Sequence, residues 1–339
     1  MMRLPAFQYL APRNLKEAAH FLSSEGTTAA LLAGGTDLFP NMKRRHQMPK
    51  TLIGLRRVSE LRGIRGSHIG AGTLLSEIER DARIRDQYPA LWKAVNSIST
   101  PVLRNMGTIG GNICLDTRCT YYNQNYEWRR AINFCLKFEG KTCWVAPSSK
   151  FCLAVNSSDT APVLCAIGAR LRLVSKAGER TVDAADFFDD DGIAYLQKRP
   201  DEILVDVELP PPPAARSAAM GMALGSSSLG GQWRATYRKL RRRGAFDFPV
   251  LGVAARLDFA GDVVRDARIW LGAVSSAPIR AVESEEAVRG TPLSDETIAR
   301  AAELAFRPAK PMDNTDFHLH WRKEMVKHFV RAALSELRS

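Results

Sequence analysis

The cysteines of this 339-residue chain are the residues whose type and spacing point most directly to chemistry. All six lie between positions 114 and 165, and four of them are separated by 15, 7 and 8 residues: Cys119, Cys135, Cys143 and Cys152. The segment around them is rich in aromatic residues, arginine and lysine. An iron–sulfur cluster held by four thiolates is anionic, and it needs side chains that exclude water and offset its charge. The pattern therefore favours an iron–sulfur centre.

The sequence alone leaves two other interpretations of these cysteines open. Structural zinc sites usually contain paired ligands with two to four residues between them, and this chain has no Cys-x-x-Cys pair. Cysteine is also among the most buried residue types, so ordinary core thiols are possible, and Cys114 and Cys165 fit that description. Disulfides are disfavoured because nothing in the chain directs it to an oxidising compartment.

Two diglycine turns form the second chemical feature. The first, residues 34–37 (Gly-Gly-Thr-Asp), follows an apolar run at 29–33 and precedes a short helix through Met42; the second is residues 108–112 (Thr-Ile-Gly-Gly-Asn). Paired glycines let backbone N–H groups approach a phosphate closely. One such turn is a weak signal, but two suit a dinucleotide whose pyrophosphate is held from both sides. No Gly-x-Gly-x-x-Gly follows a strand, so a standard Rossmann site is not indicated.

Capping residues, apolar periodicity and turn signals along the chain predict an α+β fold. A capped helix runs from Asn14 to near Gly26, and 75–97 form two helices broken near Pro89. The expected strands are 29–33, 51–55, 68–71, 161–175 (as a strand or hairpin arm), 202–209, 235–240, 250–259 and 264–274. Helices at 280–289, 293–306 and 318–337 then cover an antiparallel sheet, after a Gly/Ser-rich linker at 217–231.

Composition and charge exclude several function classes. The formal net charge is +12, yet no helix-turn-helix, zinc finger or RNA-binding aromatic motif accompanies it, so we expect no nucleic acid partner. No run of about 18 apolar residues and no N-terminal apolar segment is present, which predicts a cytoplasmic protein without a membrane partner. No nucleophile–base constellation or carboxylate pair stands out. We therefore expect no catalytic residue in this chain.

Taken together, these motifs resemble the flavin-binding medium subunit of the xanthine dehydrogenase and molybdenum hydroxylase family over nearly the whole chain. Residues 32–37 and 108–112 look like that family's two FAD pyrophosphate loops, residues 158–162 (Ser-Asp-Thr-Ala-Pro) resemble its next flavin motif, and 271–281 resemble its C-terminal domain. The resemblance implies FAD contacts at Leu31, Leu32, Ala33, Gly34, Gly35, Thr36, Asp37, Leu38, Ile98, Thr108, Ile109, Gly110, Gly111, Asn112, Asp159 and Lys239.

The same resemblance implies a fold and a domain division. A two-lobed FAD-binding domain of the PCMH type is expected before a C-terminal domain like that of CO dehydrogenase flavoproteins, with antiparallel sheet and helices. The expected ranges are 1–57 for the first lobe, 58–216 for the second with a 4Fe-4S insertion at about 115–155, 217–231 for the linker and 232–339 for the C-terminal domain.

The insertion resembles one in the β subunit of 4-hydroxybenzoyl-CoA reductase, above all at residues 116–124, and implies that Cys119, Cys135, Cys143 and Cys152 hold a 4Fe-4S cluster. The implied complex also contains a large molybdenum-pterin subunit and a small 2Fe-2S subunit, as a dimer of heterotrimers, with ferredoxin as electron donor for reductive dehydroxylation to benzoyl-CoA. The alternatives are a flavin subunit of a hydroxylase or dehydrogenase acting on another aromatic or heterocyclic substrate, and a zinc-stabilised binding module.

Overall fold

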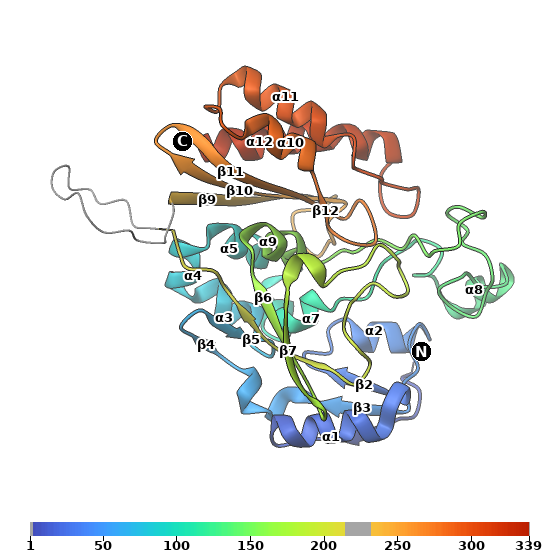
Figure 1. Ribbon diagram of the computed structural model, residues 1–339. Coiled ribbons are helices and arrows are strands. Elements are labelled where there is room, and N and C mark those ends of the chain that lie inside the picture. The colour runs from blue at the N-terminus through green and yellow to red at the C-terminus, as the bar shows by residue number, and fades with distance from the viewer. Residues whose placement is uncertain (1–2, 214–231, 339) are drawn as a thin grey trace.

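The computed structural model describes residues 3–213 and 232–338, in three sheets with helices around them (Figure 1). The linker expected at 217–231 lies outside these described residues. The N-terminal sheet is parallel, in the order β1-β3-β2, with strands at Gln8–Leu10, Thr51–Gly54 and Ala29–Leu32. Helix α1 (Leu15–Glu25) begins where the sequence predicts, because the Asn14 side chain accepts a hydrogen bond from the Glu17 N–H. Helix α2 is Leu38–Lys43.

The middle sheet is antiparallel and has five strands in the order β4-β5-β8-β6-β7. Their bounds are Ile64–Arg65, His68–Gly70, Ile203–Glu208, Arg170–Ser175 and Gly178–Asp183. Short helices surround this sheet: α3 Leu75–Arg80, α4 Ala82–Gln87, α5 Pro89–Ser97, α6 Pro101–Arg104, α7 Ile109–Ile113 and α9 Thr160–Ile167. Helix α8 (Tyr126–Ala131) lies apart from the sheet, in the segment that carries the spaced cysteines (Figure 1). Three-residue 3-10 turns occur at Gly26–Thr28, Leu55–Arg57, Ser59–Leu61 and Ala184–Asp186.

The prediction of a strand over residues 161–175 is wrong for its first half. Helix α9 occupies Thr160–Ile167, and only the second half forms strand β6. All eight residues of α9 are buried, so the helix is apolar on every side and shows no 3.6-residue period that separates it from a buried strand. Gly168, with φ +76°, ends the helix in the left-handed conformation that favours glycine.

The C-terminal sheet is antiparallel, in the order β12-β11-β10-β9, with bounds Ile279–Arg280, Val263–Gly272, Leu251–Ala260 and Gln232–Leu240. Helices α10 (Val282–Val288), α11 (Asp295–Ala305) and α12 (Leu319–Arg338) pack on one face over an apolar core. The opposite face packs on α5 and α9 (Figure 1). These helices belong to the middle unit, by which we mean the middle sheet with its surrounding helices, and Trp233, Tyr237 and Trp270 of the C-terminal sheet join the apolar core of that unit. The predicted α+β fold class is confirmed.

None of the helices in the described ranges combines the length and the apolar character that crossing a membrane requires.

Candidate functional site

A cavity of about 580 Å³ opens between the N-terminal sheet and the middle unit, and it collects most of the residues expected to contact FAD. Its size is within the range of small-molecule and cofactor sites. The expected residues that line it are Leu31, Ala33, Gly34, Gly35, Thr36, Asp37, Leu38, Ile98, Thr108, Gly110, Gly111 and Asn112. The two diglycine turns, more than 70 residues apart in sequence, therefore face one space.

The first turn connects β2 to α2 and supplies free backbone donors. Gly35 has φ +72°, in the left-handed region where a side chain is strained, and a Cβ on Gly34 would lie 1.9 Å from the carbonyl oxygen of Met106. Both glycines are thus required by the geometry. Among the described residues, the N–H groups of Gly35, Thr36 and Asp37 have no hydrogen-bond acceptor. They are available to the oxygens of a bound anion.

The second turn is built differently. The N–H groups of Ile109 and Gly110 donate to the carbonyls of Thr73 and Ala71, and that of Gly111 donates to Thr108 Oγ1. Because these three N–H groups already donate to protein acceptors, they are not free to bind a ligand. The second turn therefore contributes the shape of its surface to the cavity. A Cβ on Gly110 would lie 2.7 Å from Ala71, whereas a Cβ on Gly111 would meet only Thr108 Oγ1, at 3.1 Å.

The Ser-Asp-Thr motif at 158–160 supports this second turn. Asn112 Oδ1 accepts hydrogen bonds from Ser158 Oγ at 2.9 Å and from Thr160 Oγ1 at 2.7 Å, and all three side chains are buried. These hydrogen bonds therefore fix the orientation of the Asn112 side chain, which lines the cavity.

Four expected contact residues do not line the cavity: Leu32, Ile109, Asp159 and Lys239. Ile109 is a core residue, fully buried. Asp159 and Lys239 form a buried ion pair in which Lys239 Nζ lies 3.0 Å from Asp159 Oδ2, and the Tyr237 hydroxyl donates to Asp159 Oδ1 at 2.8 Å. Burial raises the pKa of Asp159 and lowers that of Lys239, and each partner's charge opposes the shift of the other. The pair joins α9 to β9.

Several cavity-lining residues were missed by sequence reasoning: Gln47, Asp116, Tyr195, Lys198 and Phe248. Phe248 comes from the loop after β9, and Arg118 lies over its ring at 4.4 Å while also forming an ion pair with Asp37. Burial lowers the pKa of Arg118 to about 10. The one sequence signal available was the Phe-Asp-Phe-Pro motif at 246–249, an aromatic pair in a loop. Nothing local marks the others, because loops distant in sequence bring them in.

The four spaced cysteines line a second, small cavity together with Tyr122, Lys137 and Trp144. All four thiols are buried and free. Cys119 precedes α8 and the other three cysteines follow it, so the segment from Cys119 to Cys152 folds back on itself to bring the four thiols to one cavity. The prediction that the four thiols belong to one site stays a prediction, but their convergence in space is what such a site requires.

Backbone amides point at three of these sulfurs. These N–H groups oppose the rise in thiol pKa that burial causes: Tyr121 and Tyr122 at Cys119, Lys137 and Phe138 at Cys135, and Ala154 at Cys152. Burial raises the thiol pKa to about 12 at Cys119 and to about 11 at Cys152, and these N–H donors oppose the rise. Donors two and three residues after a cysteine stabilise its thiolate form, which is the form that binds a metal.

The thiols are not arranged around one central ion. In the described part of the chain, no group of three or more His, Cys, Asp or Glu side chains is placed to hold a metal ion. A zinc site needs four sulfurs at about 2.3 Å from a single centre. The free space between the cysteines is about 10 Å³, room for roughly one water, so a cluster would have to spread the thiols apart. Four thiols are the donor type that an iron–sulfur cluster requires, but their spacing in this structure is not that of a formed metal site.

Comparison with known proteins places the chain in a family. Residues 5–212 match the family described as the FAD binding domain in molybdopterin dehydrogenase, and residues 235–337 match the CO dehydrogenase flavoprotein C-terminal domain. Among curated relatives, the glyceraldehyde dehydrogenase medium chain of Sulfolobus acidocaldarius is 27% identical over 98% of this chain and 99% of its own. The aldehyde oxidoreductase FAD-binding subunit PaoB of Escherichia coli is 30% identical, covering 84% of this chain and 86% of its own.

The fold has solved counterparts as well. A chain of the carbon monoxide dehydrogenase from Hydrogenophaga pseudoflava that lacks the Mo-pyranopterin moiety of its molybdenum cofactor superposes with a TM-score of 0.77. It is 27% identical, and the match covers 99% of this chain and 98% of that chain.

Substituting Gly111 with valine should weaken FAD binding about tenfold or more, since the new side chain enters the cavity and not the protein core. The measurement is the flavin absorbance per chain after purification, with thermal unfolding as a check of the fold. The matched control is Gly244→Val, at a loop position where a Cβ meets nothing within 4 Å. Equal flavin retention in both variants would contradict the assignment of this turn.

Substituting Lys239 with methionine should lower the free energy of unfolding by about 3–5 kcal/mol, because Asp159 is left buried without its cationic partner. Urea denaturation checks this value. The double variant Asp159→Asn, Lys239→Met should recover part of the loss, and a single variant as stable as the wild type would show that the pair contributes nothing at this boundary.

Proposed function

Because this chain belongs to the family of FAD-binding medium subunits of molybdenum hydroxylases, which includes xanthine and CO dehydrogenases, we propose that it is an electron-transfer subunit carrying FAD and a 4Fe-4S cluster. FAD would occupy the 580 Å³ cavity, with its pyrophosphate at the free N–H groups of the first turn. The cluster would be held by Cys119, Cys135, Cys143 and Cys152. The convergence of these four thiols on one cavity is the observation that carries the proposal.

The residues around each site have separable tasks. When bound, a 4Fe-4S cluster exchanges single electrons, and a flavin exchanges one or two, so the pair can link one-electron and two-electron partners. The backbone amides stabilise the thiolates that would ligate the cluster. The buried Tyr122 and the partly buried Tyr121 and Phe138 would limit the access of water to them. Phe248 lines one side of the larger cavity, and Arg118 lies over its ring.

The domain division expected from the sequence is part of the same proposal. Residues 1–57 and 58–216 would form the two FAD-binding lobes and 232–339 the C-terminal domain, which is supported by the presence of a separate sheet in each range. Asp159 and Lys239 would act on the flavin indirectly, by fixing the boundary between the middle unit and the C-terminal sheet.

The proposed complex contains a large molybdenum-pterin subunit, where substrate is converted, and a small subunit with 2Fe-2S clusters. Two such heterotrimers would form the complete assembly, with 4-hydroxybenzoyl-CoA as substrate and ferredoxin as the one-electron donor. The resemblance of the cysteine segment to the insertion of 4-hydroxybenzoyl-CoA reductase supports this first candidate. The names of the relatives favour a second candidate, a dehydrogenase in which electrons leave through the flavin, since those proteins are dehydrogenases of glyceraldehyde and carbon monoxide and an aldehyde oxidoreductase.

A zinc-stabilised binding module is the less favoured alternative, because residues 5–212 match an FAD binding domain and a module that binds only zinc leaves that match without a role.

Substituting Cys135 with serine should abolish the cluster, so that iron falls from about four per chain to near zero while FAD remains bound. Iron analysis and the visible absorption spectrum of anaerobically purified protein measure both. Cys165→Ser is the matched control, because Cys165 is a core residue whose thiol donates to the carbonyl of Ala184 and lies away from the cysteine cavity. Full iron in the Cys135 variant, or one zinc per chain in the wild type, would refute the proposed site.

The ferredoxin-dependent rate should fall about tenfold or more as the salt concentration rises, since steering of an acidic donor by exposed lysines is screened beyond about 10 Å at 0.1 M salt. Lys141 and Lys150 lie exposed in the cysteine segment. Lys141→Glu should slow the reaction at low salt, whereas Lys16→Glu, on exposed helix α1, should not. A rate independent of ionic strength would exclude an electrostatically steered donor.

A further inference from the structure

A buried ion pair spans the wall between the two cavities. Asp116 lines the larger cavity and Lys137 lines the cysteine cavity, and Lys137 Nζ lies 2.8 Å from Asp116 Oδ1. Their side chains are 8% and 7% exposed, respectively. Since each residue lines a different cavity, the pair is a direct charged connection between the two sites.

Neither end of this pair is explained by packing alone. Lys137 also donates to Thr117 Oγ1 and to the Gly192 carbonyl, and its ammonium lies 5.0 Å from the centre of the Tyr122 ring and 5.2 Å from that of Tyr195. The ammonium is therefore held by hydrogen-bond acceptors and by two aromatic faces. A buried ion pair is weak evidence for a stabilising role, because the desolvation of its two charges costs about as much free energy as their attraction supplies. The placement of this pair between two sites therefore points to a functional role.

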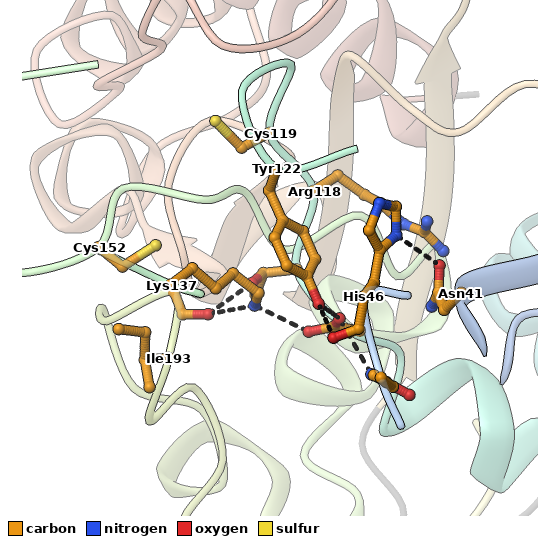
Figure 2. Close-up of polar contacts among 12 residues, drawn as sticks. Asn41, His46, Arg118, Cys119, Tyr122, Lys137, Cys152 and Ile193 are labelled. Atoms are coloured by element: carbon orange, nitrogen blue, oxygen red, sulfur yellow. Dashed lines mark hydrogen bonds and ion pairs between the residues drawn. The ribbon is translucent and has the colours of Figure 1, made fainter. Parts of the chain in front are cut away.

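The orientation of the pair is fixed on both sides. At the carboxylate end, Asp116 Oδ2 accepts from Gln47 Nε2 at 3.1 Å and from the Tyr122 hydroxyl at 3.3 Å, and Gln47 also lines the larger cavity. At the ammonium end, the bond to Gly192 draws Lys137 towards Cys152, whose carbonyl accepts from the Gly192 N–H. Figure 2 shows Lys137 between Cys152 and Tyr122. The positive end therefore faces the thiols and the negative end faces the larger cavity.

We propose that the Lys137–Asp116 pair is an electrostatic bias between the two redox sites of this chain, favouring an electron at the cysteine site over one at the flavin site. The inference rests on the proposed function. Transfer of one electron between the sites oxidises one and reduces the other by one electron, moves one negative charge across the pair, and makes or breaks no bond. The field of an oriented charge pair acts on that moving charge most strongly where water is excluded. Lys137 and Asp116 act as positioning residues, because their charges act on the electron and neither forms a bond in the transfer.

The test is a reductive titration of the whole purified chain with dithionite, which supplies the electrons, followed by absorption and by electron paramagnetic resonance. Lys137→Gln should lower the cluster's one-electron equilibrium constant for reduction about tenfold, a shift of about 59 mV to more negative potential. Asp116→Asn should shift the flavin potential to more positive values. The opposite signs follow from removing opposite charges. Lys137→Arg, which keeps the charge, should leave the cluster potential near the wild-type value.

Folding of the single variants is supported by the remaining partners. Asp116 keeps the Tyr122 hydroxyl and the Gln47 amide as donors, and Lys137 keeps Thr117 and Gly192 as acceptors. The double variant Lys137→Gln, Asp116→Asn removes both charges together and should show a smaller shift than either single variant. If Lys137→Gln fails to retain iron, the shift of the flavin in Asp116→Asn decides the case.

The outcomes separate the two proposals. A wild-type protein without iron or flavin overturns the proposed function and, with it, this inference. A wild-type protein with both groups whose potentials stay unchanged in Lys137→Gln and Asp116→Asn, or shift in the same direction in both, overturns only the electrostatic bias. Opposite shifts with retained iron and flavin support it, because a purely structural role has no reason to produce opposite signs.

Discussion

The contact between Gly34 and the backbone of Met106 is the constraint on which the larger cavity depends. With a side chain at position 34, the Cβ would lie 1.9 Å from the Met106 carbonyl oxygen, so the first turn can pack against the segment just before the second turn only through glycine. A shared apolar core of α1, β3 and β8 residues also holds the N-terminal sheet against the middle sheet. The cavity is the space left between them, and the free N–H groups of the first turn face it because the turn cannot move away.

Buried charged residues also lie where separate parts of the chain meet. Asp159 and Lys239 join the middle unit to the C-terminal sheet, and Asp116 and Lys137 join the two cavities. Arg322, fully buried under the C-terminal sheet, donates to the carbonyls of Val250, Met312 and Ala273. Desolvation makes each of these groups costly unless all its hydrogen bonds are made. Such groups therefore fix the position of one segment against another more narrowly than apolar packing does.

Each place where sequence reasoning was wrong has its own physical cause. Helix α9 was predicted as a strand because all of its residues are buried, and burial on every side removes the period that identifies a helix. Similarly, 75–97 contain a second break at Asp81, which caps α4 by accepting from the Ile84 N–H. The second diglycine turn was expected to offer N–H donors, but these are used by Thr73, Ala71 and Thr108. Which backbone donors remain free depends on neighbours distant in sequence.

The sequence by itself determined the α+β class, helix α1 with its Asn14 cap, both glycine turns, the C-terminal sheet with its helices, and the candidate cysteines. These features are written in local spacing, capping and periodicity, which act over a few residues. Only the tertiary structure decided that Gln47, Asp116, Tyr195 and Phe248 share one cavity, that Asp159 and Lys239 pair away from it, and that Lys137 stands beside the thiols. Loops carry these residues, and their positions follow from long-range packing that no short stretch of sequence encodes.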